Sequence, residues 1–117
     1  MKDNLLKKAV SWAKKRGFKK IKAVTENYDN PRTFTQSGSD EIIRPDMSGV
    51  RRGRKSYIEV AQKADDKQAI ISKWKLFSTL AEMKGGKLYL LAARGHKAFA
   101  ERIVKEHDLE NAQIVSI

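Results

Sequence analysis

The sequence contains no cysteine, only two histidines and two prolines, and no long hydrophobic run. The lack of cysteine excludes disulfides, thiolate catalysis and zinc sites of the cysteine type. No apolar stretch approaches the ~20 residues that a membrane-spanning helix requires, and no segment resembles a signal peptide. These absences predict a cytoplasmic protein without a membrane partner.

The chain is short and strongly basic. Its 117 residues suffice for one domain spanning 1–117, and a hydrophobic content of 40% is enough for a packed core. Lys and Arg number 25 against 14 Asp and Glu, which gives a net charge of +11. A charge of this sign favours nucleic acid or an anionic membrane surface as a partner, although positive charge can also serve solubility alone.

Hydrophobic spacing, caps and turn residues predict an ordered series of helices and strands. The expected elements are a helix over 4–16 capped by Asp3 or Asn4 and ended by Gly17, strands over 21–25, 41–50 and 55–62, a helix from Asp65 or Asp66 to Lys84, a buried strand over 87–93, a helix over 95–107 and a strand over 112–117. The polar stretch 26–38 is expected to be a loop. The order αβββαβαβ predicts an α/β three-layer sandwich with a central mixed β-sheet, because an antiparallel meander leads into a crossover helix and a buried strand.

Two acidic residues stand out because each lies in a strand on one side of a short basic turn. Asp46 follows Arg44-Pro45, and Glu59 lies within Tyr57-Ile58-Glu59-Val60-Ala61. Two carboxylates with room for water and phosphate are typical ligands of Mg²⁺. Asp46 could instead accept hydrogen bonds from turn amides. Glu59 has apolar neighbours, so we expect it to be buried, where an unpaired charge is costly.

The element order, Pro45-Asp46 on one strand and Glu59 on the next resemble the PD-(D/E)XK nuclease superfamily, whose fold is restriction-endonuclease-like. The resemblance extends over most of the chain. It implies that Asp46 and Glu59 bind Mg²⁺ or Mn²⁺, with the backbone carbonyl of Val60 as a further ligand. It also implies a Lys two residues after the Glu, which supports the attacking water; that position is Ala61 here.

Two other lysines could take the place of the missing one. Strand alternation puts Glu59, Ala61 and Lys63 on one face, and Lys63 begins only about 6.6 Å beyond Ala61. We therefore expect Lys63 to be the catalytic lysine. Lys67, in the first turn of the next helix, is a weaker substitute.

Other charged and aromatic residues give weaker indications of function. Arg51, Arg52, Arg54 and Lys55 crowd the tip of the predicted hairpin and could bind a phosphate backbone, or could simply be a solvated turn. The lysines of the first helix are more typical of a solvated face. His96 and His107 are too far apart to form one metal pair on a helix, and Glu26 and Asp29 are guesses for a further acidic ligand. Trp12, Trp74 and Phe77 are expected in the core.

These features lead to one expected function and two alternatives. The expected function is metal-dependent hydrolysis of phosphodiester bonds in DNA. The first alternative is a nuclease-like fold that has lost catalysis at Ala61 and acts as a DNA-binding or assembly module. The second is a homodimer formed by pairing of the last strand with its own copy.

Overall fold

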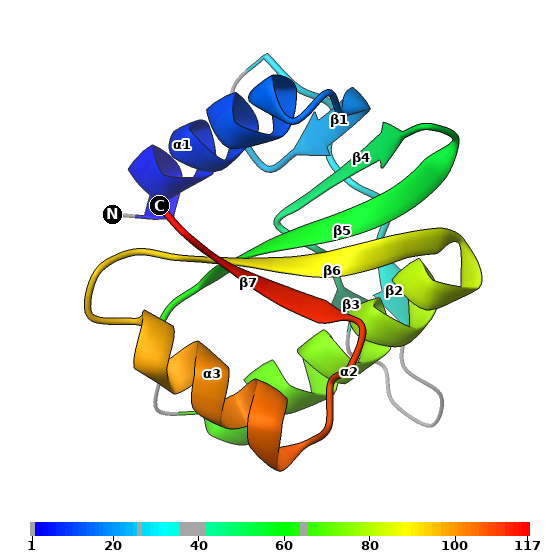
Figure 1. Cartoon of the computed structure of the whole chain (residues 1–117). Helices are drawn as coiled ribbons and strands as arrows, with labels where there is room; N and C mark the ends of the chain where they lie inside the picture. The colour runs from blue at the N-terminus through cyan, green and yellow to red at the C-terminus, as the bar shows by residue number, and fades with distance from the viewer. Residues whose placement is uncertain (1, 26, 36–41, 64–65) are drawn as a thin grey trace.

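The computed structural model describes residues 2–25, 27–35, 42–63 and 66–117, and these form an α/β protein with helices on both faces of a mixed sheet (Figure 1). The elements in chain order are α1 (Lys2–Lys15), β1 (Lys19–Ala23), β2 (Phe34–Thr35), β3 (Ile42–Ile43), β4 (Met47–Arg51), β5 (Arg54–Ala61), α2 (Lys67–Met83), β6 (Gly85–Ala92), α3 (Lys97–Glu106) and β7 (Ala112–Ser116).

The main sheet has five strands in the order β1-β4-β5-β6-β7. β1, β4 and β5 are antiparallel neighbours, whereas β6 and β7 are each added in parallel after a helix. The expected meander followed by crossover helices is therefore confirmed. A separate two-stranded ribbon, β2 with β3, packs beside this sheet.

The helices divide the core into two parts. α1 covers one face of the sheet, which we call the α1 face, and α2 and α3 cover the opposite, α2 face (Figure 1). β5 supplies both parts by alternation, because Ile58 and Val60 pack on the α1 face while Tyr57 and Ala61 pack on the α2 face. Trp74 and Phe77 are buried in the second part, as predicted, and Trp12 is half-buried in the first.

The turn between β4 and β5 follows from two residues. Arg52 and Gly53 both have positive φ, at 54° and 76°, which is the geometry of a two-residue hairpin turn of type I′. The hairpin pairs Met47 with Ile58 and Ser48 with Tyr57. This register places Asp46, immediately before β4, at the end of the hairpin remote from the turn, beside Glu59.

The predicted strand over 41–50 is wrong, because the chain breaks at Arg44-Pro45-Asp46. Proline has no N–H for a sheet ladder, and Pro45 is fully buried where β3 ends and β4 begins. Ile42 and Ile43 pair instead with Phe34 and Thr35, so part of the predicted loop over 26–38 is also a strand. Residues 26 and 36–41 lie outside the described ranges.

The helix ends differ slightly from the prediction. α1 begins at Lys2, ahead of the expected caps Asp3 and Asn4, and Gly17 follows it with a φ of 86°. Asp66 caps α2 by accepting a hydrogen bond from the Ala69 N–H at 3.1 Å; the alternative cap, Asp65, lies outside the described residues. None of the helices in the described ranges is long and apolar enough to cross a bilayer.

Candidate active site

Asp46 and Glu59 lie together as the sequence predicted, and each is held by the backbone next to the other. The Asp46 N–H donates to Glu59 Oε2 at 2.6 Å, and the Val60 N–H donates to Asp46 Oδ2 at 2.9 Å. The two residues are 6% and 2% exposed. The Val60 N–H that donates to Asp46 belongs to β5, at the end of the hairpin remote from the turn.

A lysine from α2 completes this arrangement. Lys73 Nζ lies 3.0 Å from Glu59 Oε1, and its side chain is 27% exposed. Sequence reasoning missed Lys73, although a signal was present. Trp74 and Phe77 are buried and Ile70 is half-buried along one stripe of α2, and Lys73 lies at the same helical spacing, three residues after Ile70.

The pKa of the Glu59 carboxyl is raised to about 8. Burial is the main cause, and the neighbouring Asp46 carboxylate adds to it; the Lys73 ammonium and the Asp46 N–H act in the opposite direction. The Lys73 ammonium therefore does not bring the pKa of Glu59 back to its ordinary value. A further positive charge at this point would be stabilised.

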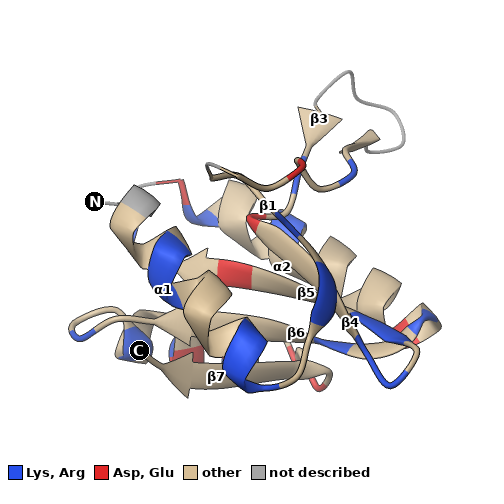
Figure 2. Cartoon of the chain, turned by 90° about the horizontal axis from the view of Figure 1, so that it is seen from above, with Lys and Arg blue, Asp and Glu red and all other residues tan. Residues whose placement is uncertain are grey.

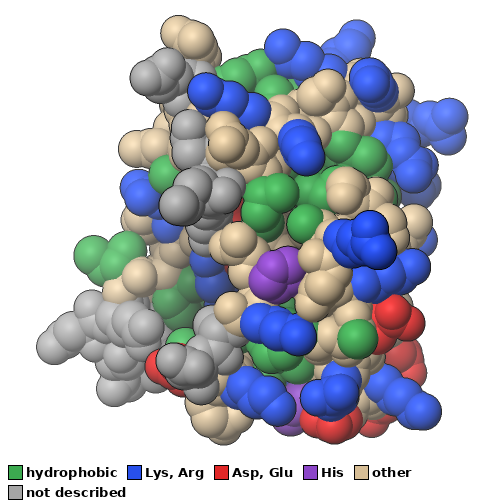
Figure 3. All heavy atoms as spheres, turned by 90° about the vertical axis from the view of Figure 1, so that its left-hand side faces the viewer, with side chains coloured by type: hydrophobic (Ala, Val, Ile, Leu, Met, Phe, Trp, Pro, Cys, Tyr) green, Lys and Arg blue, Asp and Glu red, His purple; other side chains and the backbone are tan. Residues whose placement is uncertain are grey.

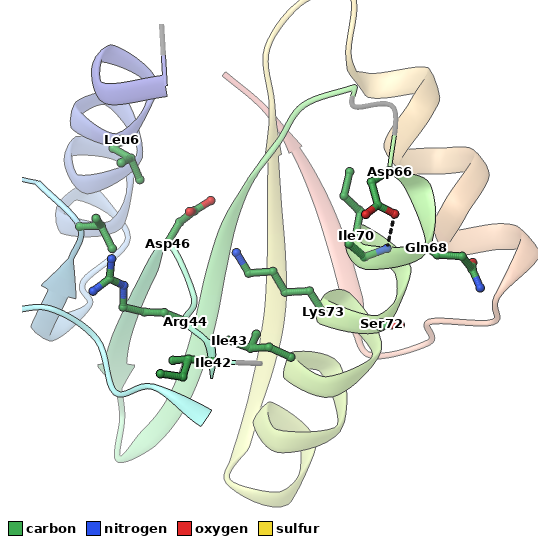
Figure 4. Close-up of a pocket in the computed structure, with 12 residues that line it drawn as sticks. Leu6, Ile42, Ile43, Arg44, Asp46, Asp66, Gln68, Ile70, Ser72 and Lys73 are labelled. Carbon is green, nitrogen blue, oxygen red and sulfur yellow. Dashed lines mark hydrogen bonds between the residues drawn. The ribbon is translucent and has the colours of Figure 1, made fainter. Parts of the chain in front are cut away.

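Asp46 and Lys73 border a cavity of about 700 Å³ that is open to solvent. Its walls come from the first turns of α2, from β3 and the residues that follow it, and from Leu6 of α1 and Val24 after β1. Figure 4 shows Asp46 and Lys73 extending from opposite walls toward one another. Asp46 of the carboxylate pair thus lines a space large enough for a ligand.

The donor set suits a hard divalent cation. Two carboxylates are what a Mg²⁺ site commonly takes from a protein, with water and phosphate filling the remaining positions. A dication beside Asp46 and Glu59 would also relieve the repulsion that raises the pKa of Glu59. Within the described ranges, no group of three His, Cys, Asp or Glu residues comes together as a metal site.

The other residues that the sequence predicted at the site do not contact the carboxylate groups of Asp46 and Glu59 through their side chains in any interaction described here. Ala61 is fully buried in the core on the α2 face, and Lys63 lies beyond the end of β5 with an exposed side chain. The Lys63 N–H donates to His96 Nδ1 at 3.0 Å. Lys67 is exposed at the start of α2. A catalytic role for Lys63 stays a prediction, whereas the observed ion pair of Glu59 is with Lys73. Val60 contributes its N–H, and its carbonyl as a ligand also stays a prediction.

The remaining acidic and histidine candidates are separate from the pair. Asp29 is exposed, and its carbonyl accepts from the Ala23 N–H at 3.0 Å; Glu26 lies outside the described residues. His96 and His107 flank α3 at its two ends, and both are half-buried.

The basic residues of the hairpin tip do not form one surface. Arg51 turns to the α1 face, where its guanidinium lies 5.1 Å from the Phe18 ring centroid and 3.4 Å from the Tyr89 hydroxyl. Lys55 turns to the α2 face, above the Tyr57 ring. Arg52 and Arg54 are exposed. Figure 2 shows Lys and Arg along α1 and at this turn, and Figure 3 shows them across the end of the molecule where β5 and β6 finish.

Comparison with known proteins adds no relative to these observations: no protein-family model, curated protein or solved structure matches the chain.

Proposed function

We propose that the protein is a metal-dependent nuclease that hydrolyses phosphodiester bonds in DNA, with Asp46 and Glu59 binding Mg²⁺ or Mn²⁺. The observation that carries the proposal is the buried carboxylate pair with the Lys73 ammonium 3.0 Å from Glu59, beside an open cavity that Asp46 and Lys73 line. Structural carboxylates are rarely buried together, because burial and mutual repulsion both disfavour their charged forms.

The sheet supports the same proposal at the level of the fold. An antiparallel meander of β1, β4 and β5 followed by a parallel β6 is the arrangement expected for a restriction-endonuclease-like fold, to which the sequence has a resemblance. The net charge of +11 suits a polyanionic substrate.

The roles of the side chains follow from their positions. Asp46 and Glu59 hold the cation, and the reciprocal N–H donors keep both carboxylates fixed. Lys73 supplies a positive charge that stabilises the negative charge developing on the phosphate in the transition state. This is the role that the resemblance implies for a lysine at the position of Ala61, here taken by a residue of α2.

When bound, the cation lowers the pKa of its water and offsets charge on the phosphate. A P–O bond forms from the water oxygen while the P–O bond to the leaving sugar oxygen breaks. The leaving sugar oxygen takes up a proton from the solvent, so the reaction consumes one water molecule and no other reactant.

The test is cleavage of supercoiled plasmid and of single-stranded DNA in Mg²⁺ or Mn²⁺. Asp46→Asn should abolish metal-dependent cleavage, because the amide can still accept from the Val60 N–H but is a poor ligand. Asp108→Asn is the matched control, since Asp108 is exposed with a φ of 50°, which Asn tolerates. Equal cleavage by Asp46→Asn and wild type would contradict the proposal.

The same assay distinguishes the two candidate lysines. Lys73→Met keeps the length of the stem and removes the ammonium, so cleavage should fall about 10²–10³-fold. Lys63→Met and the exposed Lys75→Met should then retain most of the activity. Loss of cleavage in Lys63→Met alone would instead assign the role to Lys63.

A second candidate function is a DNA-binding or assembly module on the same fold. It is favoured by one observation: both Glu59 oxygens already contact protein donors, Asp46 N–H and Lys73 Nζ, so that the pair could stand without a cation. Under this candidate the wild type binds DNA in a salt-sensitive manner, does not cleave it, and is unaffected by Asp46→Asn.

A further inference from the structure

The α2 face of the sheet also carries basic side chains at a distance from the carboxylate pair. Alternation along β5 puts Lys55, Tyr57 and Glu59 on this face. The strand register aligns Lys22 of β1 with Ser48 of β4, and Ser48 with Tyr57, so Lys22 lies on the same face. Lys55 is four residues from Glu59, which is about 13 Å along the strand. The basic side chains are thus separate from the pair.

Two of the cations on this side are held over aromatic rings that contact one another. The Arg32 guanidinium lies 5.8 Å from the Phe34 ring centroid, and Lys55 Nζ lies 5.5 Å from the Tyr57 centroid. The two rings are edge to face, with centroids 6.2 Å apart. Cations positioned over rings keep their charge while losing side-chain freedom, so they are ordered before a ligand arrives.

Within the part of the chain that the structure describes, the charges that shift the pKa of Lys55 are those of cations. Burial lowers the pKa of Lys55, and the charges of Lys84, Lys22 and Arg32 lower it further. Lys22, Arg32 and Lys84 are exposed and Lys55 is half-buried. Four cations gathered in this way repel one another, and a bound anion would relieve that repulsion.

We propose that Lys22, Arg32, Lys55 and Lys84 form a phosphate-binding surface for the nucleic-acid strand as it leads away from the carboxylate pair. This inference rests on the proposed function, because it treats that pair as the point of cleavage and this surface as the place where the flanking backbone is held. Contacts to phosphate position a strand without reading its sequence, so the surface would add affinity and not base preference.

The direction of the strand follows from the two sites. Between Glu59 and Lys55 this face is filled, because Tyr57 is buried against Phe34 and Phe77, so the substrate backbone passes outside the core on its way to Lys55. The α1 face, with Arg51 against Phe18 and Tyr89, is the opposite side of the sheet and is not part of this path.

The experiment measures binding of a labelled 20-mer DNA, single- or double-stranded, by fluorescence anisotropy in EDTA over a range of NaCl concentrations. The variant Arg32→Gln with Lys55→Met removes two charges and retains most of each stem. The control Lys8→Gln with Lys15→Gln removes two charges from exposed positions of α1. Removing one cation that neutralises a phosphate should lower the slope of log Kd against log salt by about 0.7–0.9.

We expect the Arg32/Lys55 variant to bind at least about tenfold more weakly at 100 mM NaCl, with the slope reduced by about 1.4–1.8, and the control to stay within about twofold of wild type. Lys22→Gln, at an exposed position that cannot affect the core, should reduce the slope by about half as much. Equal losses in variant and control, or an unchanged slope in Lys22→Gln, would overturn the inference.

The same variants test whether the surface binds a polyanion other than nucleic acid. Loss of binding to phosphatidylserine vesicles or to polyglutamate, with DNA binding intact, would overturn the assignment to nucleic acid. The binding assay contains no divalent metal, so its outcome does not depend on catalysis. Salt-sensitive binding at this surface without any cleavage contradicts only the proposed nuclease, and cleavage with an unchanged slope contradicts only this surface.

Discussion

At the scale of single residues, the site is defined by two carboxyl groups that are buried side by side. Glu59 accepts from the Asp46 N–H, Asp46 accepts from the Val60 N–H, and the Lys73 ammonium forms an ion pair with Glu59. Replacing such groups by apolar residues often stabilises a protein. A buried pair that leaves a carboxyl pKa raised is therefore a candidate for function more than for stability.

This arrangement predicts how stability depends on pH without metal. The pKa of Glu59 is raised from its ordinary value near 4.5 to about 8 by burial and by the charge of Asp46. The folded state thus binds the Glu59 proton more tightly than the unfolded state does. The resulting stabilisation is fully present below about pH 4.5 and is lost as the pH rises through about 8.

We expect the contribution of Glu59 to the free energy of unfolding to fall by about 1–3 kcal/mol between pH 5 and pH 8. Urea unfolding in EDTA at several pH values measures the change, and Glu59→Gln should remove it because the amide does not titrate. With Mg²⁺ present the loss should shrink, since binding displaces the proton. A Glu59→Gln protein with the same pH slope as wild type would contradict the prediction.

At the scale of elements, the parallel pairing of β5 with β6 depends on one glycine. A Cβ on Gly86 would lie 1.9 Å from the carbonyl oxygen of Lys55, which is backbone and cannot move aside. Gly86→Ala should therefore separate the start of β6 from β5 and lower the free energy of unfolding by about 2–4 kcal/mol. Thermal or urea unfolding measures this change.

Gly53→Ala is the matched control for the Gly86 substitution. Gly53 has a φ of 76° and open space around its added Cβ, so alanine meets only the backbone penalty of about 1–2 kcal/mol. A loss of stability in Gly86→Ala no larger than that in Gly53→Ala would show that the two strands do not approach as closely as described.

The elements that sequence could predict are those with a local cause. Periodicity marks α1, α2 and α3, the apolar run marks β6, and Gly53 marks the hairpin turn. The break before β4 was missed because the predicted strand included Pro45, although proline cannot donate to a ladder. The β2–β3 ribbon was missed because strands of two residues carry no periodicity and depend on tertiary packing of Phe34 and Ile43.

The residues of the candidate site also differ in whether a local cause makes them predictable from the sequence. Asp46 and Glu59 were predicted because both flank one hairpin, so their proximity follows from local pairing. Lys73 was not predicted, because its contact with Glu59 depends on how α2 packs across β5. The separation of Arg51 from Lys55 was also missed, although it depends on the register of the hairpin, which pairs Lys55 with Val50 and Arg51 with Arg54.

At the scale of the whole molecule, the charge of +11 on 117 residues opposes the compact state. The repulsion acts between exposed cations, and salt screens such interactions over about 8–10 Å at physiological concentration. Chloride should therefore stabilise the folded protein, in contrast to its effect on a protein held by surface ion pairs.

We expect the free energy of unfolding to rise by about 1–2 kcal/mol between 20 and 300 mM NaCl. Urea unfolding at fixed pH measures the rise, and glycerol at equal osmolarity controls for effects unrelated to charge. The Lys8→Gln/Lys15→Gln protein, with two fewer cations, should gain less than wild type. If added salt lowered the stability of the wild type, attraction between particular pairs would outweigh the net repulsion. The basic side chains would then form ion pairs within the folded protein and would not be available to bind a polyanion.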